Sequence, residues 1–563
     1  MIIQLRPYQQ AAVDETYQAW RNGNQNVCLV MPTGSGKAFT LSFVAKEYAS
    51  RQEKVIIQVH RKELLGQLSC SLAAIGVMHT FIAPKKTINF ICRLHREKFQ
   101  GRCYYSTTAK VCLATVQTLV RRNTTSWESL VKLKICDEFH HLQKGNIWGK
   151  AWEKFENANG LGPTATPQRT DGGGLSRETD GFADYMVLGP TMRQLIDLGA
   201  LSKYRVFAPR TDIRDELLKT DIRDEFTAQS VEEALLGSHI VSNAVREYQR
   251  VMLNEQAIVF GRSVQNAEEL ANEFNAAGIS ALALSSNDDD EKRERGMRDF
   301  VNGKLRILTN YALFDEGVDV PGLTGVIDCQ PTKSLIKFHQ KWGRMLRTAP
   351  GKQYGIYIDM VHNLRIGDIG NHALPDSPQL WSLDRTKTRS KEEQDDIVKL
   401  TNCLNCWSPY AADLHACPYC GTVPPAPTPR GLSAGPVLID DDLVELTPET
   451  LANLRGEIDS ARQDSTEAMH EKFGAAASGI IPMKWRKDHR KRKEELQELD
   501  RIISLWAGMW HEFGMTDADI HEEFRKAYRM SIFQARALKR AEAEKLREKI
   551  TVALVDNGVI VTE

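Results

Sequence analysis

The chain has 563 residues, a length typical of three or four domains, and its 73 Lys and Arg residues are balanced by 73 Asp and Glu residues. This balance argues neither for nor against a polyanionic partner, so any nucleic-acid surface must be a local patch. The sequence contains no run of about 18 apolar residues and no basic-then-apolar leader, which predicts a protein of the reducing cytosol without a membrane partner.

Apolar runs flanked by turn residues alternate with helix-period segments in two blocks, as in parallel α/β sheets. The strands expected in the first block are Val27–Val30, Val55–Val59, Val111–Ala114, Leu133–Cys136 and the stretch ending at Thr166. Those expected in the second are Ala257–Phe260, Ala281–Leu284, Arg306–Leu308, Val326–Ile327 and Ile356–Ile358. Between the blocks, TDIRDE occurs twice, which indicates a charged, solvated connector.

The first expected strand leads into MPTGSGKA, residues 31–38. Gly34 and Gly36 allow the backbone to wrap a phosphate, and Lys37 supplies a cation for the β and γ phosphates of a nucleotide. Ala38 stands where such loops carry the Ser or Thr that binds magnesium. The loop therefore predicts nucleotide binding and raises the question of whether hydrolysis survives.

A second motif, KICDEFHH, places the acidic residues Asp137 and Glu138 at the end of an apolar strand. Side chains there face the crevice in which open α/β sheets bind ligands. Asp137 is suited to hold magnesium and Glu138 to orient and deprotonate the attacking water. The alternative is a pair of exposed acids that begin a loop.

These motifs resemble those of superfamily 2 helicases. In the first block the similar segments are LRPYQ (5–9), PTGSGK (32–37), HRKELLGQ (60–67), ATVQTL (114–119), DEFHH (137–141) and TATPQR (164–169). In the second they are IVFGRSV (258–264), TNYALFDEGVDVP (309–321) and QKWGRMLR (340–347). The resemblance is closest to the DEAD/DEAH-type helicases of phages and prophages, which often carry a cysteine cluster after the motor.

The resemblance implies a set of site residues. Asp137 and Glu138 would serve the metal and the water, and Arg344 and Arg347, with Gln340 beside them, would reach the γ phosphate from the second domain. The implied nucleotide contacts are Arg6, Gln9, Thr33, Gly34, Ser35, Gly36, Lys37, Ala38, Gly317 and Asp319. The implied nucleic-acid contacts are Arg61, Lys62, Thr118, Thr164, Thr166 and Thr309, with Thr164 to Thr166 coupling the two sites.

The resemblance also implies an ATP- and Mg²⁺-dependent DNA helicase or translocase, single-stranded or forked DNA as partner, and replication or recombination proteins as further partners. Replication, recombination or repair would be the setting, in the bacterial host cytoplasm if the chain is phage-encoded. Two alternatives stay open. One is a hydrolysis-impaired, ATP-responsive nucleic-acid clamp or adaptor in which Ala38 records lost catalysis, and the other is an RNA helicase.

After the second block, two CxxC pairs, Cys403 with Cys406 and Cys417 with Cys420, provide four thiolates. This pattern predicts a closed, structural Zn²⁺ site. An iron–sulfur centre or a redox dithiol are the competing interpretations.

The remaining chain is expected to be helical, with segments at about 484–512, 517–528 and 532–550 and N-caps at Thr516 and Ser531. The run at 484–493 carries seven Lys or Arg against one acid and is either a DNA-backbone contact or a solvated helix face. The short connection after Tyr528 permits a helix-turn-helix, although a helical hairpin is the simpler interpretation.

The predicted fold class is therefore α/β, with two tandem RecA-like parallel-sheet domains followed by a zinc ribbon and a helical domain. The predicted boundaries are 1–203 for the first RecA-like domain, 204–365 for the second with its charged connector at 210–250, 400–422 for the ribbon, 423–445 for a Pro-rich linker and 446–563 for the helical domain.

Overall fold

The computed structural model describes most of the chain. The described residues are 4–59, 61–169, 171–208, 244–311, 313–314, 320, 322–332, 334–361, 363–364, 374–377, 379, 381–385, 400–403, 405–406, 409–411, 414, 416–423, 443–455, 483–536 and 538–557. The predicted nucleotide contacts Gly317 and Asp319, the connector over 209–243 and the proline-rich stretch over 424–442 lie outside them. Within the described residues, no helix is both long and apolar enough to span a bilayer.

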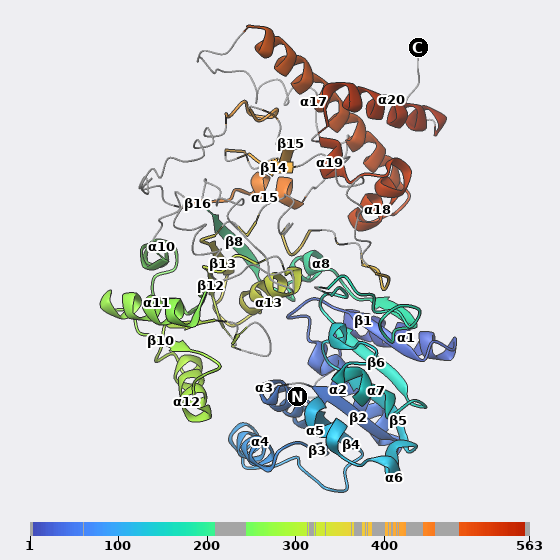
Figure 1. The fold of residues 1–563 in the computed structure, drawn as a ribbon, viewed down its shortest axis with the longest axis vertical. Helices are drawn as coiled ribbons and strands as arrows, with labels where there is room; N and C mark the ends of the chain where they lie inside the picture. Colours follow the sequence, from blue (N-terminus) through green and yellow to red (C-terminus); the bar gives the residue numbers. More distant parts are fainter. Residues whose placement is uncertain are drawn as a thin grey trace.

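The first domain is built on a seven-stranded parallel sheet of order β3-β4-β2-β5-β6-β1-β7 (Figure 1). Its strands are β1 (Asn26–Val30), β2 (Lys54–Val59), β3 (His79–Ile82), β4 (Val111–Thr115), β5 (Val131–Cys136), β6 (Asn159–Thr164) and β7 (Tyr185–Leu188). Its helices are α1 (Pro7–Arg21), α2 (Lys37–Ser50), α3 (Lys62–Ala74), α4 (Lys85–Lys98), α5 (Val116–Arg121), α6 (Thr125–Glu128), η1 (Phe139–His141) and α7 (Ile147–Glu153). All five strands predicted in this block are confirmed.

The second domain repeats this plan with the order β10-β11-β9-β12-β13-β8-β16. Its strands are β8 (Lys203–Ala208), β9 (Ala257–Phe260), β10 (Ala281–Leu284), β11 (Ile307–Asn310), β12 (Gly325–Asp328), β13 (Tyr354–Asp359) and β16 (Val444–Glu445). Its helices are α8 (Met192–Asp197), α10 (Ala244–Val251), α11 (Val264–Ala276), α12 (Asp290–Val301), α13 (Leu335–Met345) and α15 (Pro448–Arg455). All five predicted strands are confirmed, and only β16 runs antiparallel to its neighbour among the described strands of this sheet.

The predicted strands were visible in the sequence because most of their residues are apolar and buried. Every residue of β1 and of β9 is buried, and Val27–Val30 and Ala257–Phe260 read as unbroken apolar runs. The prediction missed β3, β7 and β8, which mix polar or partly exposed residues with apolar ones.

Two predicted domain boundaries need correction. Helix α8, assigned to the first domain, packs through Met192, Leu195 and Ile196 into the core of the second. At the other end, β16 pairs with β8 and the buried leucines of 446–454 join the same core, so residues 443–455 belong neither to the linker nor to the helical domain. Tertiary burial decided both points, because short amphipathic segments do not reveal which domain they pack against.

The C-terminal part consists of a small ribbon and a helical domain, which Figure 1 shows at the end of the molecule opposite the first domain. The ribbon pairs β14 (Leu400–Asn402) with β15 (Pro409–Ala411). The helices are α17 (Met483–Glu512), α18 (Asp517–Tyr528), α19 (Ile532–Arg536) and α20 (Arg540–Asp556), so the third predicted helix is broken in two. Thr516 caps α18 with a reciprocal bond to Asp519, and Ser531 accepts a bond from the Gln534 backbone N–H before α19, as expected.

Candidate active site

The loop between β1 and α2 adopts a conformation that depends on its glycines. Gly34 and Gly36 both have φ of +87°. A Cβ atom on Gly36 would lie 2.5 Å from the Gln9 side-chain nitrogen, so neither the backbone nor the space permits a side chain there. The turn places Lys37 at the N-terminus of α2, where backbone N–H groups and the helix dipole favour a phosphate.

Asp137 and Glu138 directly follow β5. They lie at the carboxyl ends of the strands, where the phosphate loop also begins. Glu138 has φ of +56°, a left-handed conformation that is uncommon outside glycine, and its backbone N–H donates to Asp137 Oδ1 at 3.2 Å. Both residues line the same cavity as Lys37. The carboxyl ends of β1 and β5, which are separated in the parallel sheet by β6, thus bring together residues about 100 positions apart in the sequence.

Helix α13 of the second domain closes this cavity. Its Gly343 packs so tightly against the loop that an added Cβ atom would lie 2.2 Å from the Thr33 Cβ atom. The cavity has a volume of about 1010 Å³ and is lined by Gln340, Arg344 and Arg347 from α13 and the residue segment after it. Phosphate-binding and arginine-bearing motifs therefore meet across the cleft between the domains.

Lys37 is one of several charged residues that line the cavity. Burial lowers the pKa of its ammonium group, whereas the Glu138 and Asp137 carboxylates oppose that effect and Arg347 adds to it. The ammonium donates to the carbonyl oxygens of Met31 at 3.2 Å and Pro32 at 3.4 Å. A polyphosphate in the cavity would supply the negative charge that this group and the two arginines share.

The end of α13 is capped by another lysine. Lys352 donates to the carbonyl oxygens of Met345 at 2.5 Å and Arg347 at 2.8 Å. Burial lowers the pKa of Lys352 to about 8. These bonds fix the backbone of Arg347, as does the donation from Ser202 Oγ to the Arg347 carbonyl oxygen at 3.2 Å.

Three of the predicted nucleotide contacts, Arg6, Gln9 and Ser35, contact one another in this structure. Among the described residues, the cavity lining includes Thr33, Gly34, Gly36, Lys37 and Ala38 but not Arg6, Gln9 or Ser35. The Gln9 side chain donates to the Ser35 carbonyl oxygen at 3.1 Å and accepts from the Arg6 backbone N–H at 2.9 Å. Gln9 thus joins α1 to the phosphate loop, and its contact with adenine stays a prediction.

The predicted nucleic-acid contacts are distributed between the cleft and the protein interior. Arg61 donates to the Leu313 carbonyl oxygen of the second domain at 3.1 Å, and Lys62 forms an ion pair with Asp290. Thr118 accepts a bond from Thr115 at 2.8 Å. Thr309 is fully buried and donates to the Ala267 carbonyl oxygen, so this structure gives no support to a nucleic-acid contact by its hydroxyl group.

One residue that the sequence prediction gave no role joins the acids to the threonine motif. His140 Nδ1 lies 3.5 Å from Glu138 Oε2 and 3.0 Å from Thr164 Oγ1, and Thr164 Oγ1 donates to the Thr166 carbonyl oxygen at 3.0 Å. These contacts connect Glu138 with Thr164 and Thr166, and the coupling of the nucleotide site to a nucleic-acid strand by these threonines stays a prediction. The DEFH segment could have indicated this role, since His140 follows the acid pair with only Phe139 between them.

Comparison with known proteins identifies the motor. Residues 2–169 match the family described as type III restriction enzyme, res subunit, and residues 240–349 match the helicase conserved C-terminal domain. A 51.5 kDa protein of a Lactococcus phage is 31% identical over 394 residues, which cover 69% of this chain and 76% of the phage protein. The chain is a superfamily 2 helicase. Enzymes of this class hydrolyse ATP.

More distant relatives share only about half of their own length with the helicase. A Saccharomyces cerevisiae protein provisionally named ATP-dependent helicase IRC3 is 27% identical over 64% of this chain, which spans about half, 52%, of the yeast protein. The DNA 3'-5' translocase XPB2 of Sulfurisphaera tokodaii is 29% identical over 38% of this chain and 55% of its own length.

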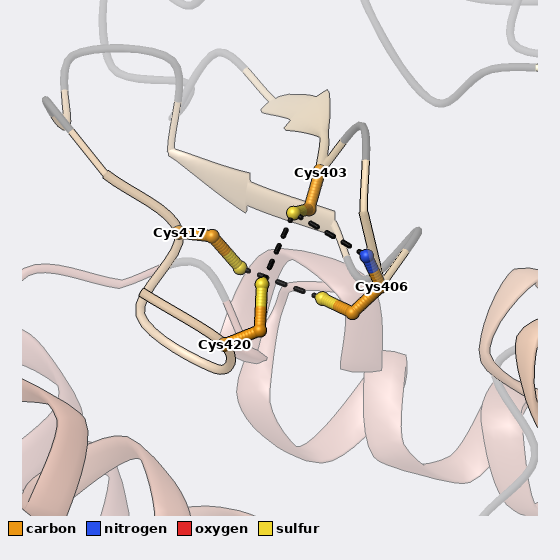
Figure 2. Close-up of side chains that lie close together, drawn as sticks. All are labelled: Cys403, Cys406, Cys417 and Cys420. Carbon is orange, nitrogen blue, oxygen red and sulfur yellow. Dashed lines mark hydrogen bonds between the residues drawn. The ribbon is translucent and has the colours of Figure 1, made fainter. Parts of the chain in front are cut away.

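The four ribbon cysteines of the helicase converge as the sequence predicts (Figure 2). All four sulfur atoms lie within 4.8 Å of one another, with Cys403 Sγ 3.3 Å from Cys420 Sγ and Cys406 Sγ 3.6 Å from Cys417 Sγ. A tetrahedral zinc–thiolate site with bonds of about 2.3 Å has sulfur–sulfur edges of about 3.8 Å. The cluster fits a structural Zn²⁺ ion, and the metal itself stays a prediction.

The ribbon is joined to the helical domain through a partly buried tyrosine. Tyr419 Oη donates to the Arg536 carbonyl oxygen in α19 at 2.6 Å. In the basic run of α17, Arg492 is buried and donates to the Leu538 carbonyl oxygen at 3.0 Å. At least one cation of that run therefore stabilises the helical domain instead of facing a polyanion.

Helix α18 does not suit the helix-turn-helix interpretation. It carries four acids, Asp517, Asp519, Glu522 and Glu523, and the helix that follows it, α19, has only five residues. An acidic helix and a short one are poor candidates for the major groove.

Proposed function

We propose that this helicase couples ATP hydrolysis to movement on, or unwinding of, DNA. The observation that carries the proposal is the shared cavity, in which Lys37, Asp137 and Glu138 of one domain face Gln340, Arg344 and Arg347 of the other. An arginine supplied across a cleft reaches the γ phosphate only when the cleft is closed. Hydrolysis then alternates closed and open states, and a bound strand moves by steps.

In this proposal each residue has one role. Lys37 binds the β and γ phosphates, Asp137 holds Mg²⁺, and Glu138 orients and deprotonates the attacking water. Mg²⁺ neutralises phosphate charge when bound. Arg344 and Arg347 stabilise charge on the transferred phosphoryl group, and His140 transmits the state of Glu138 to Thr164.

DNA is the proposed track. The archaeal protein named as a DNA translocase supports DNA over RNA. We place the activity in phage or bacterial DNA replication, recombination or repair, in the bacterial host cytoplasm, with the Zn²⁺ ribbon and helical domain as the targeting part. Replication or recombination proteins are proposed partners.

A hydrolysis-impaired clamp remains the second candidate because Ala38 lacks the hydroxyl group that holds magnesium in related loops. ATP turnover measured without nucleic acid and with single-stranded DNA, duplex DNA, forked DNA or RNA separates the candidates. We expect stimulation by DNA, loss of turnover in Lys37→Ala and Glu138→Gln, and normal turnover in Lys46→Ala, an exposed control on α2. Stimulation by RNA alone would favour an RNA helicase, and wild-type turnover equal to that of Glu138→Gln would favour the clamp.

A further inference from the structure

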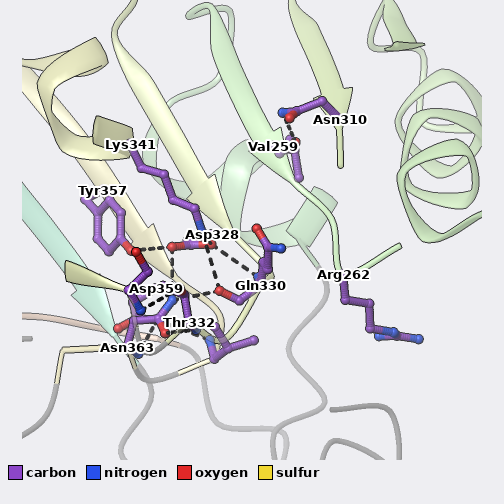
Figure 3. Close-up of polar contacts among 12 residues, drawn as sticks. Val259, Arg262, Asn310, Asp328, Gln330, Thr332, Lys341, Tyr357, Asp359 and Asn363 are labelled. Atoms are coloured by element: carbon purple, nitrogen blue, oxygen red, sulfur yellow. Dashed lines mark hydrogen bonds and ion pairs between the residues drawn. The ribbon is translucent and has the colours of Figure 1, made fainter. Parts of the chain in front are cut away.

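A fully buried ion pair lies beneath the helix that carries the cavity arginines. Lys341 follows Gln340 directly on α13, and its side chain is completely shielded from solvent. Its ammonium nitrogen lies 2.7 Å from Oδ1 of Asp328, the equally buried last residue of β12 (Figure 3). The pair joins α13 to the sheet of the second domain.

The Asp328 carboxylate is held by four donors. Besides Lys341, its Oδ1 accepts the Gln330 backbone N–H at 3.2 Å. Its Oδ2 accepts Tyr357 Oη at 2.7 Å and Asn363 Nδ2 at 3.0 Å. The three donors other than Lys341 therefore fix the position and orientation of the carboxylate.

The surrounding loops are fixed in the same way. Asp359, at the end of β13, accepts the backbone N–H groups of Asn363 at 2.9 Å and Leu364 at 2.8 Å. Asn363 in turn accepts the Thr332 backbone N–H at 3.1 Å. As Figure 3 shows, these contacts connect β12, β13 and their following loops into one polar network beneath α13.

Stabilisation of the folded state alone does not explain this polar network with its buried ion pair. Desolvation of two charges offsets most of their attraction, and apolar replacements of buried ion pairs are often neutral or stabilising. What an ion pair adds is geometry, because a charged group tolerates only a few arrangements of its partners in a medium of low dielectric constant.

The geometry matters because of where α13 points. Gln340, Arg344 and Arg347 recur at helical spacing and line the cavity, whereas Lys341 lies about 100° around the helix from Gln340 and extends toward the sheet, with Phe260 beneath its ammonium group. A guanidinium about 8 Å from a helix axis moves by about 3 Å when the helix rotates by about 20°. A misplacement of about 1 Å can cost about 100-fold in rate.

We propose that Lys341 is a positioning residue for ATP hydrolysis, which sets the rotation of α13 through Asp328 so that Arg344 and Arg347 reach the γ phosphate. This inference rests on the proposed function of those arginines. Lys341 touches neither nucleotide nor strand in this role. It acts through the helix alone.

The test replaces the pair by apolar residues, in the double variant Lys341→Met/Asp328→Leu, which leaves no uncompensated charge. We expect the variant to fold, to bind ATP with a KM within about 3-fold of wild type because Lys37 and its loop lie in the other domain, and to lose about 10- to 100-fold in kcat. A folded double variant with wild-type kcat would overturn the proposal.

An Arg344→Ala background separates the two levels of inference. If Lys341 acts through the arginines, the double replacement adds little to the loss already caused by Arg344→Ala, whereas independent effects multiply. Multiplied losses would overturn the positioning role. Full turnover in Arg344→Ala alone would instead refute the proposed function of the arginine.

A milder pair of variants applies if the double replacement does not fold. Tyr357→Phe removes one donor from Asp328, and Tyr248→Phe removes a bond of equal length, 2.7 Å, to the Glu255 carbonyl oxygen elsewhere in the domain. We expect a drop of about 3- to 10-fold in kcat for Tyr357→Phe only. Equal kcat in the two variants would overturn the proposal.

Discussion

At the scale of single residues, Ala38 distinguishes this helicase from its class. It lines the cavity beside Lys37, with a methyl group where a hydroxyl group ordinarily binds Mg²⁺. The other groups proposed for hydrolysis line the same cavity. The proposed site therefore lacks one Mg²⁺ ligand and keeps its remaining groups. A water can occupy the vacant coordination position, although it is held less rigidly than a side chain.

We therefore expect slow but measurable, DNA-stimulated turnover in the wild-type chain. Ala38→Thr should raise turnover by about 5- to 150-fold, equivalent to about 1–3 kcal/mol in the transition state, and lower the Mg²⁺ requirement. Ala38→Val is the matched control, because it fills the same volume without an oxygen. Equal turnover and equal Mg²⁺ dependence in the Thr and Val variants would show that the metal is held differently.

A second residue-scale prediction concerns Lys134 in β5. Its ammonium nitrogen lies 4.6 Å from the centre of the Trp152 ring, and burial lowers its pKa to about 8. The unfolded chain keeps this proton up to an ordinary pKa of about 10.4, so stability should rise with pH between about 8 and 10.4. At pH 7 both states are charged and the cost of burial is present in full.

Lys134→Met should therefore raise the free energy of unfolding at pH 7 by about 1–3 kcal/mol and remove this part of the rise at higher pH. Lys132→Met, at an exposed position of the same strand, is the control and should change neither. Denaturant unfolding at pH 7, 8, 9 and 10 measures both effects. A destabilised Lys134→Met variant at pH 7 would show that the ring contact outweighs desolvation.

At the scale of elements, the ribbon is too small to fold by apolar burial alone. Its described core consists of the cysteines with Tyr410, Leu414 and Tyr419. Domains of this size need a metal or other cross-link to offset the entropy of ordering the chain. Because Tyr419 also contacts α19, loss of the metal should be felt in the helical domain.

We expect about one zinc per chain by elemental analysis, and Cys403→Ser or Cys417→Ser should release it. Limited proteolysis should then cut within 400–422, while ATP binding is largely spared. Cys92→Ser, outside the cluster, should keep the metal. A metal-free protein whose four ribbon thiols titrate freely in the folded state would exclude zinc, and visible absorbance from iron would favour the iron–sulfur alternative.

At the scale of the whole molecule, the cleft is also held by ion pairs between α12 and the first domain, and Lys62, Arg93 and Glu294 of these pairs line the same cavity. Asp290, in the first turn of α12, pairs across the cleft with Lys62 and, at 3.0 Å, with Lys86. Arg93 on α4 pairs with Glu294 on α12 at 2.9 Å. The cations around Asp290 hold the pKa of that carboxyl well below its usual range.

Asp290→Ala should therefore open the cleft of the nucleotide-free protein, because Lys62 and Lys86 lose their shared partner. Small-angle scattering should show a larger radius of gyration, and a non-hydrolysable ATP analogue should reverse it. Glu291→Ala, an exposed acid in the same helical turn, is the matched control. Identical scattering from both variants would mean that these pairs do not hold the cleft.

Local sequence patterns were sufficient to predict ten of the strands, the phosphate loop with its missing hydroxyl group, the acid pair and the spacing of the four cysteines. These features are local: an apolar run, a glycine pair or a CxxC pattern indicates its structure from neighbouring residues alone. The helix caps at Thr516 and Ser531 were predictable for the same reason.

Which distant residues meet depends on the tertiary structure. Contacts between segments far apart in the chain place α8, β16 and α15 on the second domain and join Gln9 to the phosphate loop. Such contacts also bury Thr309 and form the Lys341–Asp328 pair. A polar residue in a sequence does not reveal whether it will face solvent, a ligand or a buried partner. That choice is made by the free energy of the whole packed chain, in which each buried polar group must find its partner.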